Sequence, residues 1–310
     1  MISIVLASYN GSKYIREQLD SILTQTYQDF ELIICDDCST DNTWQILEEY
    51  AEMDNRVKIY KNEKNLGFKK NFERGISLCN GEYIALSDQD DIWMETHLEV
   101  LLSIIKDNML VCGDAIFIDK SGTCESTNRK LSDMHYDMHS ITNNLTRLKC
   151  LLFRGNPYQG ASMLFKKNFL KYVLPIPDKC AFHDEWFAMV ATALNTFVYT
   201  FTIVNKYRLH STSVTNHFQE SLVNKILKHN HFRNKIEEII PYVMALKTIE
   251  NYVDKETFDI IKYTTILSQN VKQRLWRWEN YNTYSNIMKD IFKNNSVINI
   301  TLRKIQYLFF

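Results

Sequence analysis

Short apolar runs alternate with helical periodicity over the first part of the chain. Residues 2–7 and 32–35 are nearly continuous apolar segments, the pattern of strands that helices cover on both faces. Between them, apolar residues recur at helical spacing at Tyr14, Ile15, Leu19, Ile22 and Leu23. The alternation continues with a helix predicted at 44–50, a strand at 57–60, a helix at 68–78 and a strand at 83–87. It predicts an α/β fold with a mostly parallel, doubly wound sheet flanked by helices.

The pattern is less regular further along the chain. Ser, Thr, Asn, Asp and Met dominate residues 120–149, which predicts a long, partly mobile loop. A strand is then predicted at 161–165, a helix from Lys179 through Leu194, and two strands between Thr196 and Tyr207.

The last third of the chain has a different character. After residue 216 glycine is absent, Pro241 is the one proline, and apolar residues fall at helical intervals. We therefore expect an α/β domain over residues 1–215 and an all-helical extension over residues 216–310.

Composition narrows the classes of protein to consider. With 36 basic and 37 acidic side chains, the chain offers no global electrostatic reason to expect nucleic acid as a partner. Seven scattered cysteines favour reduced thiols in a cytosolic protein, and for the Cys35/Cys38 pair we favour structural thiols over redox chemistry. No secretory signal precedes the strand at Ile2, and no apolar run of about 18 residues predicts a transmembrane helix.

An acidic cluster follows the strand at 83–87. Asp88, Asp90 and Asp91 lie within four positions, and carboxylates at the end of a buried strand are costly unless a cation or ligand uses them. Because open α/β sheets bind ligands beyond the carboxyl ends of their strands, the cluster predicts a divalent metal holding a phosphorylated substrate. For Asp91 alone, an acidic turn that caps the next helix is the favoured interpretation.

Further polar groups fall at other predicted strand or helix ends, at residues 8–10, 36–37 and 183–185. In a parallel sheet the carboxyl ends share one edge, so these groups are expected to converge on one crevice.

Several ordered motifs together resemble family 2 glycosyltransferases over residues 2–215. They are Ser8-Tyr9-Asn10, Asp36-Asp37-Cys38-Ser39, Asn65-Leu66-Gly67-Phe68, Asn80-Gly81-Glu82-Tyr83 and Asp88-Gln89-Asp90-Asp91-Ile92-Trp93. The last of these, with His183-Asp184-Glu185-Trp186 and Tyr207-Arg208-Leu209-His210, is similar to the bacterial branch that includes rhamnosyltransferases of polysaccharide assembly.

The resemblance implies a GT-A fold that transfers a sugar from a nucleotide diphosphate to an acceptor hydroxyl with inversion. It implies that Ala7 and Tyr9 line the base and ribose pocket, that Asp37 accepts the ring N–H of the base, and that Asp88 faces the nucleotide. It further implies that Asp90 binds Mg²⁺ or Mn²⁺ and that Asp184 is the general base.

The resemblance also places Arg208 and His210 near the diphosphate, with His210 able to complete the metal coordination. A departing diphosphate gathers negative charge, so a cation and an arginine stabilise the transition state more than the ground state.

The base assignment has an alternative. Glu185 follows Asp184 directly, and we favour Asp184 because the motif matches there. A helix amino terminus lowers the pKa of a carboxyl group and burial raises it, and the sequence leaves open which effect is larger.

Four nearby residues have less specific predictions. His183 is expected to be a hydrogen-bonded structural residue, and Trp93 is expected in the core. Trp186 fits either the core or a sugar platform. Gly160 is expected to allow close backbone approach near the sugar and the acceptor.

The tail combines positive charge with aromatic residues. Residues 224–235 are basic and without acids, and aromatic residues follow at 276–278 and 307–310. Such a surface suits the anionic inner face of a membrane, and equally a basic helical face packed on the domain or a dimer interface.

Together these features predict a metal-dependent, inverting glycosyltransferase of bacterial surface polysaccharide biosynthesis. We expect a dTDP- or UDP-sugar donor, a glycan or lipid-linked acceptor, and a cytoplasmic location, with peripheral contact to the inner membrane face under the membrane interpretation of the tail. The alternatives are a nucleotidyltransferase, for which residues 8–12 lack the Gly-rich basic loop, and a non-catalytic sugar-nucleotide or glycan-binding module, which would not need an acid at Asp184.

Overall fold

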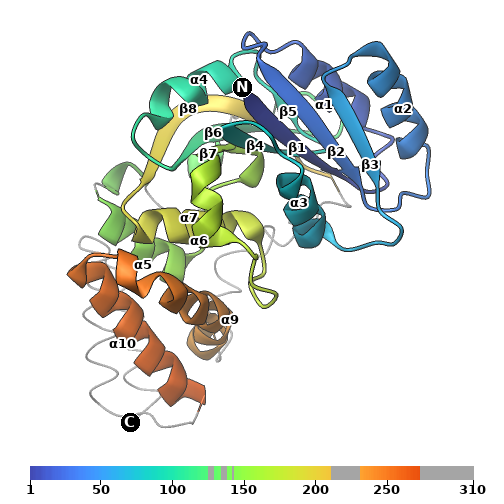
Figure 1. Cartoon of the computed structure of the whole chain (residues 1–310). Helices are drawn as coiled ribbons and strands as arrows, with labels where there is room; N and C mark the ends of the chain where they lie inside the picture. The colour runs from blue at the N-terminus through green and yellow to red at the C-terminus, as the bar shows by residue number, and fades with distance from the viewer. Residues whose placement is uncertain (125–128, 134–137, 142, 211–230, 273–310) are drawn as a thin grey trace.

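The computed structural model of the chain describes residues 1–124, 129–133, 138–141, 143–210 and 231–272. Its centre is an eight-stranded sheet with the strand order β3-β2-β1-β4-β7-β6-β8-β5, and helices cover both faces (Figure 1). The predicted α/β class is confirmed, and the sheet is mixed, with parallel and antiparallel pairs.

The first half of the sheet follows the predicted alternation. Its elements are β1 (Ile2–Ser8), α1 (Ile15–Leu23), β2 (Phe30–Asp36), α2 (Thr43–Met53), β3 (Val57–Lys61), α3 (Phe68–Ser77) and β4 (Tyr83–Asp88). The strands pair in parallel, with Ser8 opposite Asp36 and Ala7 opposite Asp88. The residues that follow β1, β2 and β4 therefore share one edge, as the sequence predicts.

The second half of the sheet is less regular. Its elements are β5 (Ile92–Trp93), α4 (His97–Ile105), β6 (Leu110–Ile118), α5 (Asn144–Arg154), β7 (Met163–Lys166), α6 (Leu170–Val173), α7 (His183–Ala193) and β8 (Phe197–Arg208), with 3₁₀ turns at Leu131–Asp133, Met138–Ser140, Gly160–Ser162 and Lys167–Phe169. Strand β7 is antiparallel to β4 and β6, and β5 is antiparallel to β8. We did not predict α4 or β6 from the sequence.

The prediction of two strands between Thr196 and Tyr207 is wrong, because β8 is one long strand. Its pairing with β6 shifts register between Cys112 and Ala115. At this irregularity a Cβ on Gly113 would lie 2.4 Å from Val204 Cγ2, so the glycine lets the two strands approach. A register shift of this kind interrupts the regular alternation that a sequence pattern can detect.

The loop predicted over residues 120–149 is shorter than expected. Helix α5 starts inside it, where the Asn143 side chain accepts a hydrogen bond from Thr146 N at 2.8 Å and caps the helix. Residues 125–128, 134–137 and 142 of this segment lie outside the described residues, so its predicted mobility stays a prediction.

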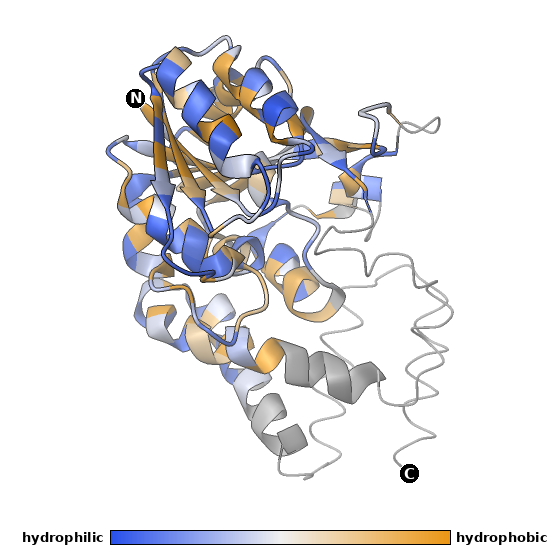
Figure 2. Ribbon diagram, turned by 90° about the vertical axis from the view of Figure 1, so that its right-hand side faces the viewer, coloured by the Kyte–Doolittle hydropathy of each residue, from blue (hydrophilic) through white to orange (hydrophobic). Residues whose placement is uncertain are grey.

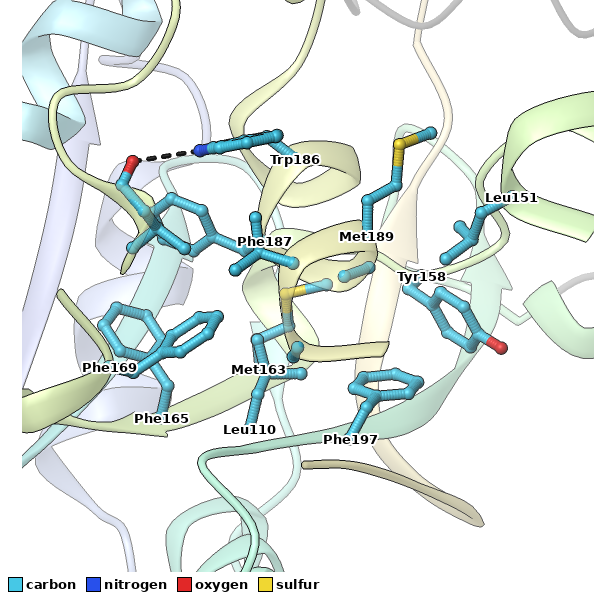
Figure 3. Close-up of a cluster of buried hydrophobic side chains, with 14 of the residues drawn as sticks. Leu110, Leu151, Tyr158, Met163, Phe165, Phe169, Trp186, Phe187, Met189 and Phe197 are labelled. Atoms are coloured by element: carbon cyan, nitrogen blue, oxygen red, sulfur yellow. Dashed lines mark hydrogen bonds between the residues drawn. The ribbon is translucent and has the colours of Figure 1, made fainter. Parts of the chain in front are cut away.

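Two hydrophobic clusters fill the space between the sheet and its helices. Helices α1, α2 and α4 cover one face, while α3, α5 and α7 cover the other. The apolar strands lie beneath helices whose outer faces are hydrophilic (Figure 2). Trp93 is 3% exposed, as expected of a core residue, and Trp186 is also buried, with its indole Nε1 donating to Val173 O at 2.9 Å (Figure 3).

The described part of the C-terminal extension is helical, as predicted. It consists of α9 (His231–Leu246), a 3₁₀ segment (Lys247–Tyr252) and α10 (Lys255–Lys272). Ile239, Tyr242 and Val243 of α9 join the same core cluster as α5 and α7. No helix in the described ranges combines the length and apolarity needed to span a membrane. The basic and aromatic stretches at 224–230, 276–278 and 307–310 lie outside the described residues.

Candidate active site

The loops after β1 and β4 are joined by one side chain. Gln89 Oε1 accepts from Tyr9 N at 2.9 Å, and Gln89 Nε2 donates to Tyr9 O at 3.0 Å. The Tyr9 side chain is 46% exposed beside this link, and Ala7 is half-buried at the end of β1. A Cβ on Gly11 would collide with Gln89, so this glycine gives the link its space. We assigned no role to Gln89 from the sequence, although it lies within the acidic motif.

Asp37 follows β2 and is 2% exposed. Its carboxylate accepts hydrogen bonds from Asn62 Nδ2 at 2.6 Å, Leu66 N at 2.7 Å and Gly67 N at 2.8 Å. Gly67 has a φ of 80°, a conformation that glycine adopts without strain. Asp37 therefore fixes the turn that precedes α3.

Asp91 is fully buried and joins three segments. It accepts from Gln159 Nε2 at 2.7 Å, Asn205 Nδ2 at 2.8 Å and Arg208 N at 3.0 Å. Burial and the charge of Asp90 raise the pKa of the Asp91 carboxyl group to about 7, although these hydrogen bonds lower it. Asp91 thus connects the acidic loop to β8 and to the turn before β7, rather than capping the next helix.

Arg208 is also buried, and its guanidinium is occupied by protein groups. Nε donates to Asp90 O at 2.7 Å, and Nη2 pairs with Glu17 Oε2 at 2.7 Å. The guanidinium also lies 4.7 Å from the centre of the Tyr14 ring. In this arrangement Arg208 holds the backbone of Asp90, and its predicted contact with a diphosphate stays a prediction.

Asp90 and His210 face each other at the same edge. Asp90 Oδ2 lies 2.7 Å from His210 Nε2, and the two side chains are 23% and 10% exposed. The His210 ring packs against Tyr14, with 5.0 Å between ring centres. The structure therefore brings together the two residues that we predicted to share a metal.

Asp184, the second residue of α7, approaches from the other half of the sheet. Its Oδ1 accepts from Glu185 N at 2.6 Å and its Oδ2 from Gly160 N at 3.2 Å. Burial raises the pKa of Asp184 to about 7, which outweighs these backbone hydrogen bonds. The effect of burial therefore exceeds the effect of the helix terminus that the sequence left open.

Three carboxylates beside β4 and α7 act on Asp88. Burial raises the pKa of Asp88 well above its usual range, and the charges of Asp91, Asp90 and Asp184 raise it further. Asp184 thus lies near the acidic loop although the two are far apart in sequence.

His183 differs from its prediction. It is 6% exposed, but neither ring nitrogen has a hydrogen-bond partner among the residues that the structure describes. The ring lies against Phe72, with 4.3 Å between ring centres, and burial and Lys69 lower its pKa to about 3, so it is neutral. Aromatic neighbours replace the polar partners that we expected.

Gly160 lies in close contact with helix α7, and its predicted proximity to the sugar and the acceptor stays a prediction. A Cβ at this position would lie 3.0 Å from His183 Nε2 and 3.4 Å from Asp184 Cβ. The glycine therefore lets its backbone N–H reach the Asp184 carboxylate.

One cysteine of the Cys35/Cys38 pair has the environment of a structural thiol. Cys35 is buried in β2, and burial raises the pKa of its thiol to about 11, which disfavours the reactive thiolate. All cysteines in the described residues are free.

The residues of the acidic edge fit a divalent cation in part. In the described ranges, no group of three or more His, Cys, Asp or Glu side chains forms a complete metal site. Mg²⁺ and Mn²⁺ accept water and phosphate oxygens as further ligands. Asp90 and His210 therefore fit a cation whose coordination the phosphates of a donor complete, and the raised pKa of Asp88 marks negative charge that a cation would balance.

Open α/β sheets bind ligands in the crevice beyond the carboxyl ends of their strands, which is where these carboxylates gather. The model of glycosyl transferase family 2 matches residues 3–174, more than half of the chain, and the chain belongs to this family.

Two curated relatives illustrate the sequence similarity. An uncharacterized glycosyltransferase of Haemophilus influenzae is 28% identical over 329 residues, covering 100% of this chain and 98% of its own. The Escherichia coli UDP-Glc:alpha-D-GlcNAc-diphosphoundecaprenol beta-1,3-glucosyltransferase WfgD is 36% identical over 108 residues, covering 35% of this chain and 42% of its own.

Two solved structures share the fold. TarS of S. aureus, in complex with UDP-GlcNAc, has a TM-score of 0.60 at 19% identity and covers 94% of this chain and 80% of its own. The mannosyltransferase PcManGT of Pyrobaculum calidifontis, in complex with GDP-Man and Mn²⁺, has a TM-score of 0.52 at 13% identity and covers 99% of this chain and 84% of its own.

Proposed function

We propose that the protein is a metal-dependent, inverting glycosyltransferase that moves a sugar from a nucleotide diphosphate to an acceptor hydroxyl. One observation carries the proposal. The Asp184 carboxyl group, with a pKa raised to about 7, lies near enough to Asp88 to raise its pKa as well, beside the pair formed by Asp90 and His210. A proton acceptor and a group suited to a cation thus occur at one edge of the sheet.

On the donor side, we propose that Ala7, Tyr9 and Asp37 receive the nucleotide. The exposed Tyr9 ring lies at the end of β1 and suits stacking on a base. Each Asp37 oxygen already accepts from the turn before α3, and a carboxylate oxygen can accept more than one hydrogen bond, which leaves capacity for a ring N–H. Asp88 at the end of β4 would face the same nucleotide.

On the phosphate side, Asp90 and His210 would hold Mg²⁺ or Mn²⁺ together with the donor phosphates. The cation would neutralise charge that develops on the departing diphosphate. Arg208 contributes by fixing the backbone of Asp90, and a direct contact with phosphate would require one of its present partners to exchange.

On the acceptor side, Asp184 would take the proton of the acceptor hydroxyl. A base with a pKa close to the working pH is efficient, because it is ionised and still basic. Glu185 is the alternative, but its charge and a hydrogen bond act on Tyr242 of α9, on another side of the helix. This difference in direction supports Asp184.

The substrate is proposed from the relatives. TarS was solved with UDP-GlcNAc, and the name of WfgD describes transfer from UDP-Glc to a lipid diphosphate acceptor. We propose a UDP- or dTDP-sugar donor, rhamnose included, and a glycan or lipid-linked acceptor of bacterial surface polysaccharide. This chemistry would occur in the cytoplasm or on the inner membrane face, with residues 1–215 as the transferase domain and 216–310 as the helical extension.

Release of the nucleotide diphosphate tests the proposal. The protein is incubated with a panel of UDP-, dTDP- and GDP-sugars in Mn²⁺ or Mg²⁺, and the nucleotide diphosphate is quantified. We expect release from at least one donor, a loss on chelation, and a loss of about 100-fold in Asp90→Ala. Pyrophosphate release from a nucleoside triphosphate would indicate a nucleotidyltransferase, and binding without turnover would indicate a binding module.

A further inference from the structure

The segment that carries Asp184 is held in place by an unusual set of backbone contacts. Phe182, the residue before α7, provides no side-chain cap for the helix. The amides of Ala181 and Phe182 instead donate to one hydroxyl group, that of Tyr242 in α9, at 2.9 and 3.2 Å. A residue of the C-terminal extension thus supplies the hydrogen-bond acceptor that the segment itself lacks.

All hydrogen-bonding capacity of the Tyr242 hydroxyl is used. A hydroxyl oxygen has two lone pairs and one proton. The two amides occupy the lone pairs, and the proton is directed to Glu185, which acts on Tyr242 through its charge and a side-chain hydrogen bond. Since Tyr242 is 3% exposed, water does not compete freely for these bonds.

Helix α3 also holds this segment. Lys69 Nζ donates to Asp178 O at 2.7 Å and to Cys180 O at 2.5 Å. Four backbone groups between residues 178 and 182 are therefore fixed, two by a lysine and two by a tyrosine. Asp184 lies two residues beyond the last of them, so its position depends on this support.

We propose that Tyr242 is a positioning residue through which helix α9 of the C-terminal extension holds the base-bearing segment of the active site. The catalytic consequence rests on the proposed function, while the link between Tyr242 and residues 181–182 does not. The extension is then a structural part of the active site, and Glu185 serves the support rather than the chemistry.

The Tyr242 ring also packs in the core beside Ile239 and Val243. A Tyr242→Phe substitution keeps this packing and removes only the hydroxyl. Tyr252→Phe is the matched control, because Tyr252 belongs to the same extension and is 65% exposed.

Hydrogen exchange tests the link without any need for activity. Amide exchange of the full chain is followed by mass spectrometry on peptides spanning residues 178–186. We expect about tenfold faster exchange at Ala181 and Phe182 in Tyr242→Phe and wild-type exchange in Tyr252→Phe. Exchange at these amides equal to wild type in Tyr242→Phe would overturn the link.

Steady-state kinetics test the consequence with the best donor of the panel. Calorimetric titration with the matching nucleotide diphosphate counts the folded sites, so that kcat is expressed per binding site. In Tyr242→Phe we expect kcat to fall about tenfold while the donor KM changes less than twofold, because the base is displaced and the donor site is not. A kcat per site equal to wild type would overturn the positioning role.

A double-substitution cycle distinguishes a supporting role of Glu185 from a role as the general base. If Glu185 acts only through Tyr242, Glu185→Gln lowers kcat no more than Tyr242→Phe does, and the two effects combine less than additively. A loss of about 1,000-fold in Glu185→Gln alone would make Glu185 the base and overturn the assignment. If no donor is turned over, the proposed function fails, and hydrogen exchange still decides the link.

Discussion

Two carboxylates at opposite ends of the sheet, buried Glu31 and half-buried Asp184, have pKa values shifted in opposite directions. Glu31, near the amino end of β2, accepts from Ser3 Oγ, Lys58 Nζ and Asn80 N, each at 2.7 Å. Burial alone would raise the pKa of Glu31, but these hydrogen bonds lower it to about 2. Asp184, beyond the carboxyl end, accepts two backbone amides from the part of the chain that the structure describes, and burial raises its pKa to about 7.

The difference shows that the two ends of the sheet place their carboxylates in environments suited to different roles. A carboxylate surrounded by donors, one of them a cation, stays ionised and ties strands together. A carboxylate with few donors beside other acids is ready to take a proton. Burial acts to raise the pKa of both groups, and the number and charge of the partners decide between support and chemistry.

Removing the carboxylate at one end of the sheet should lower kcat, and removing it at the other end should leave kcat unchanged. We expect Asp184→Asn to lower kcat about 1,000-fold, because the amide cannot accept a proton at neutral pH. Glu31→Gln should leave kcat per folded site near wild type. Both are measured as transfer or donor hydrolysis, with nucleotide diphosphate binding as the check on folding. Equal losses in the two variants would remove the functional distinction.

The pH dependence of kcat tests directly whether Asp184 is the general base. The base must be ionised, so kcat rises with pH through its pKa of about 7 and at pH 5 is about 100-fold below its plateau. Nucleotide diphosphate affinity, measured by calorimetry over the same range, controls for loss of donor binding. A kcat that stays constant from pH 5 to 8 would contradict the assignment.

A substitution at a third carboxylate, Asp37, tests whether donor binding can be weakened without affecting the general base Asp184. Asp37→Asn places an amide N–H against the backbone amides of Leu66 or Gly67. We expect the affinity for the nucleotide diphosphate to fall about tenfold, since the turn before α3 shifts and the ring N–H of the nucleobase loses its acceptor. Calorimetry measures the effect, with the exposed Asp107→Asn as control. Wild-type affinity in Asp37→Asn would argue against a donor role.

The smallest expected effect is on stability at the Glu31 end. Glu31→Gln should lower the Tm at pH 7 by about 4 °C, because the ion pair with Lys58 is lost. The folded-state pKa is lowered, so this stabilisation is present above pH 4.5 and is lost as the pH falls towards 2. Calorimetric scans at pH 7 and pH 3, with the exposed Glu63→Gln as control, measure it. A Tm difference that grows as the pH falls would contradict this sign.

The sequence determined the parallel half of the sheet almost completely. Strands buried on both faces give continuous apolar runs, helices give a 3.6-residue period, and parallel pairing then places Ser8, Asp36 and Asp88 at one edge. The presence of Asp90 and His210 at this edge was therefore predictable from motif and topology. Helix α4 and strand β6 were missed, and β8 was predicted as two strands, because its register with β6 shifts part-way along.

Tertiary structure decided the contacts that give these residues their properties. Asp91 lies 68 positions from Gln159 and 117 from Arg208, and Tyr242 lies 61 and 60 positions from the two amides that it accepts. No local periodicity encodes such pairs. The same Asp-x-Asp-Asp motif could leave its acids exposed or buried, and only the packing of β8 and α7 around it fixes their pKa values. The chain sequence thus supplies the chemical groups and the edge where they meet, because those follow from local pattern. Burial and long-range hydrogen bonds, which depend on the whole fold, assign each group its task.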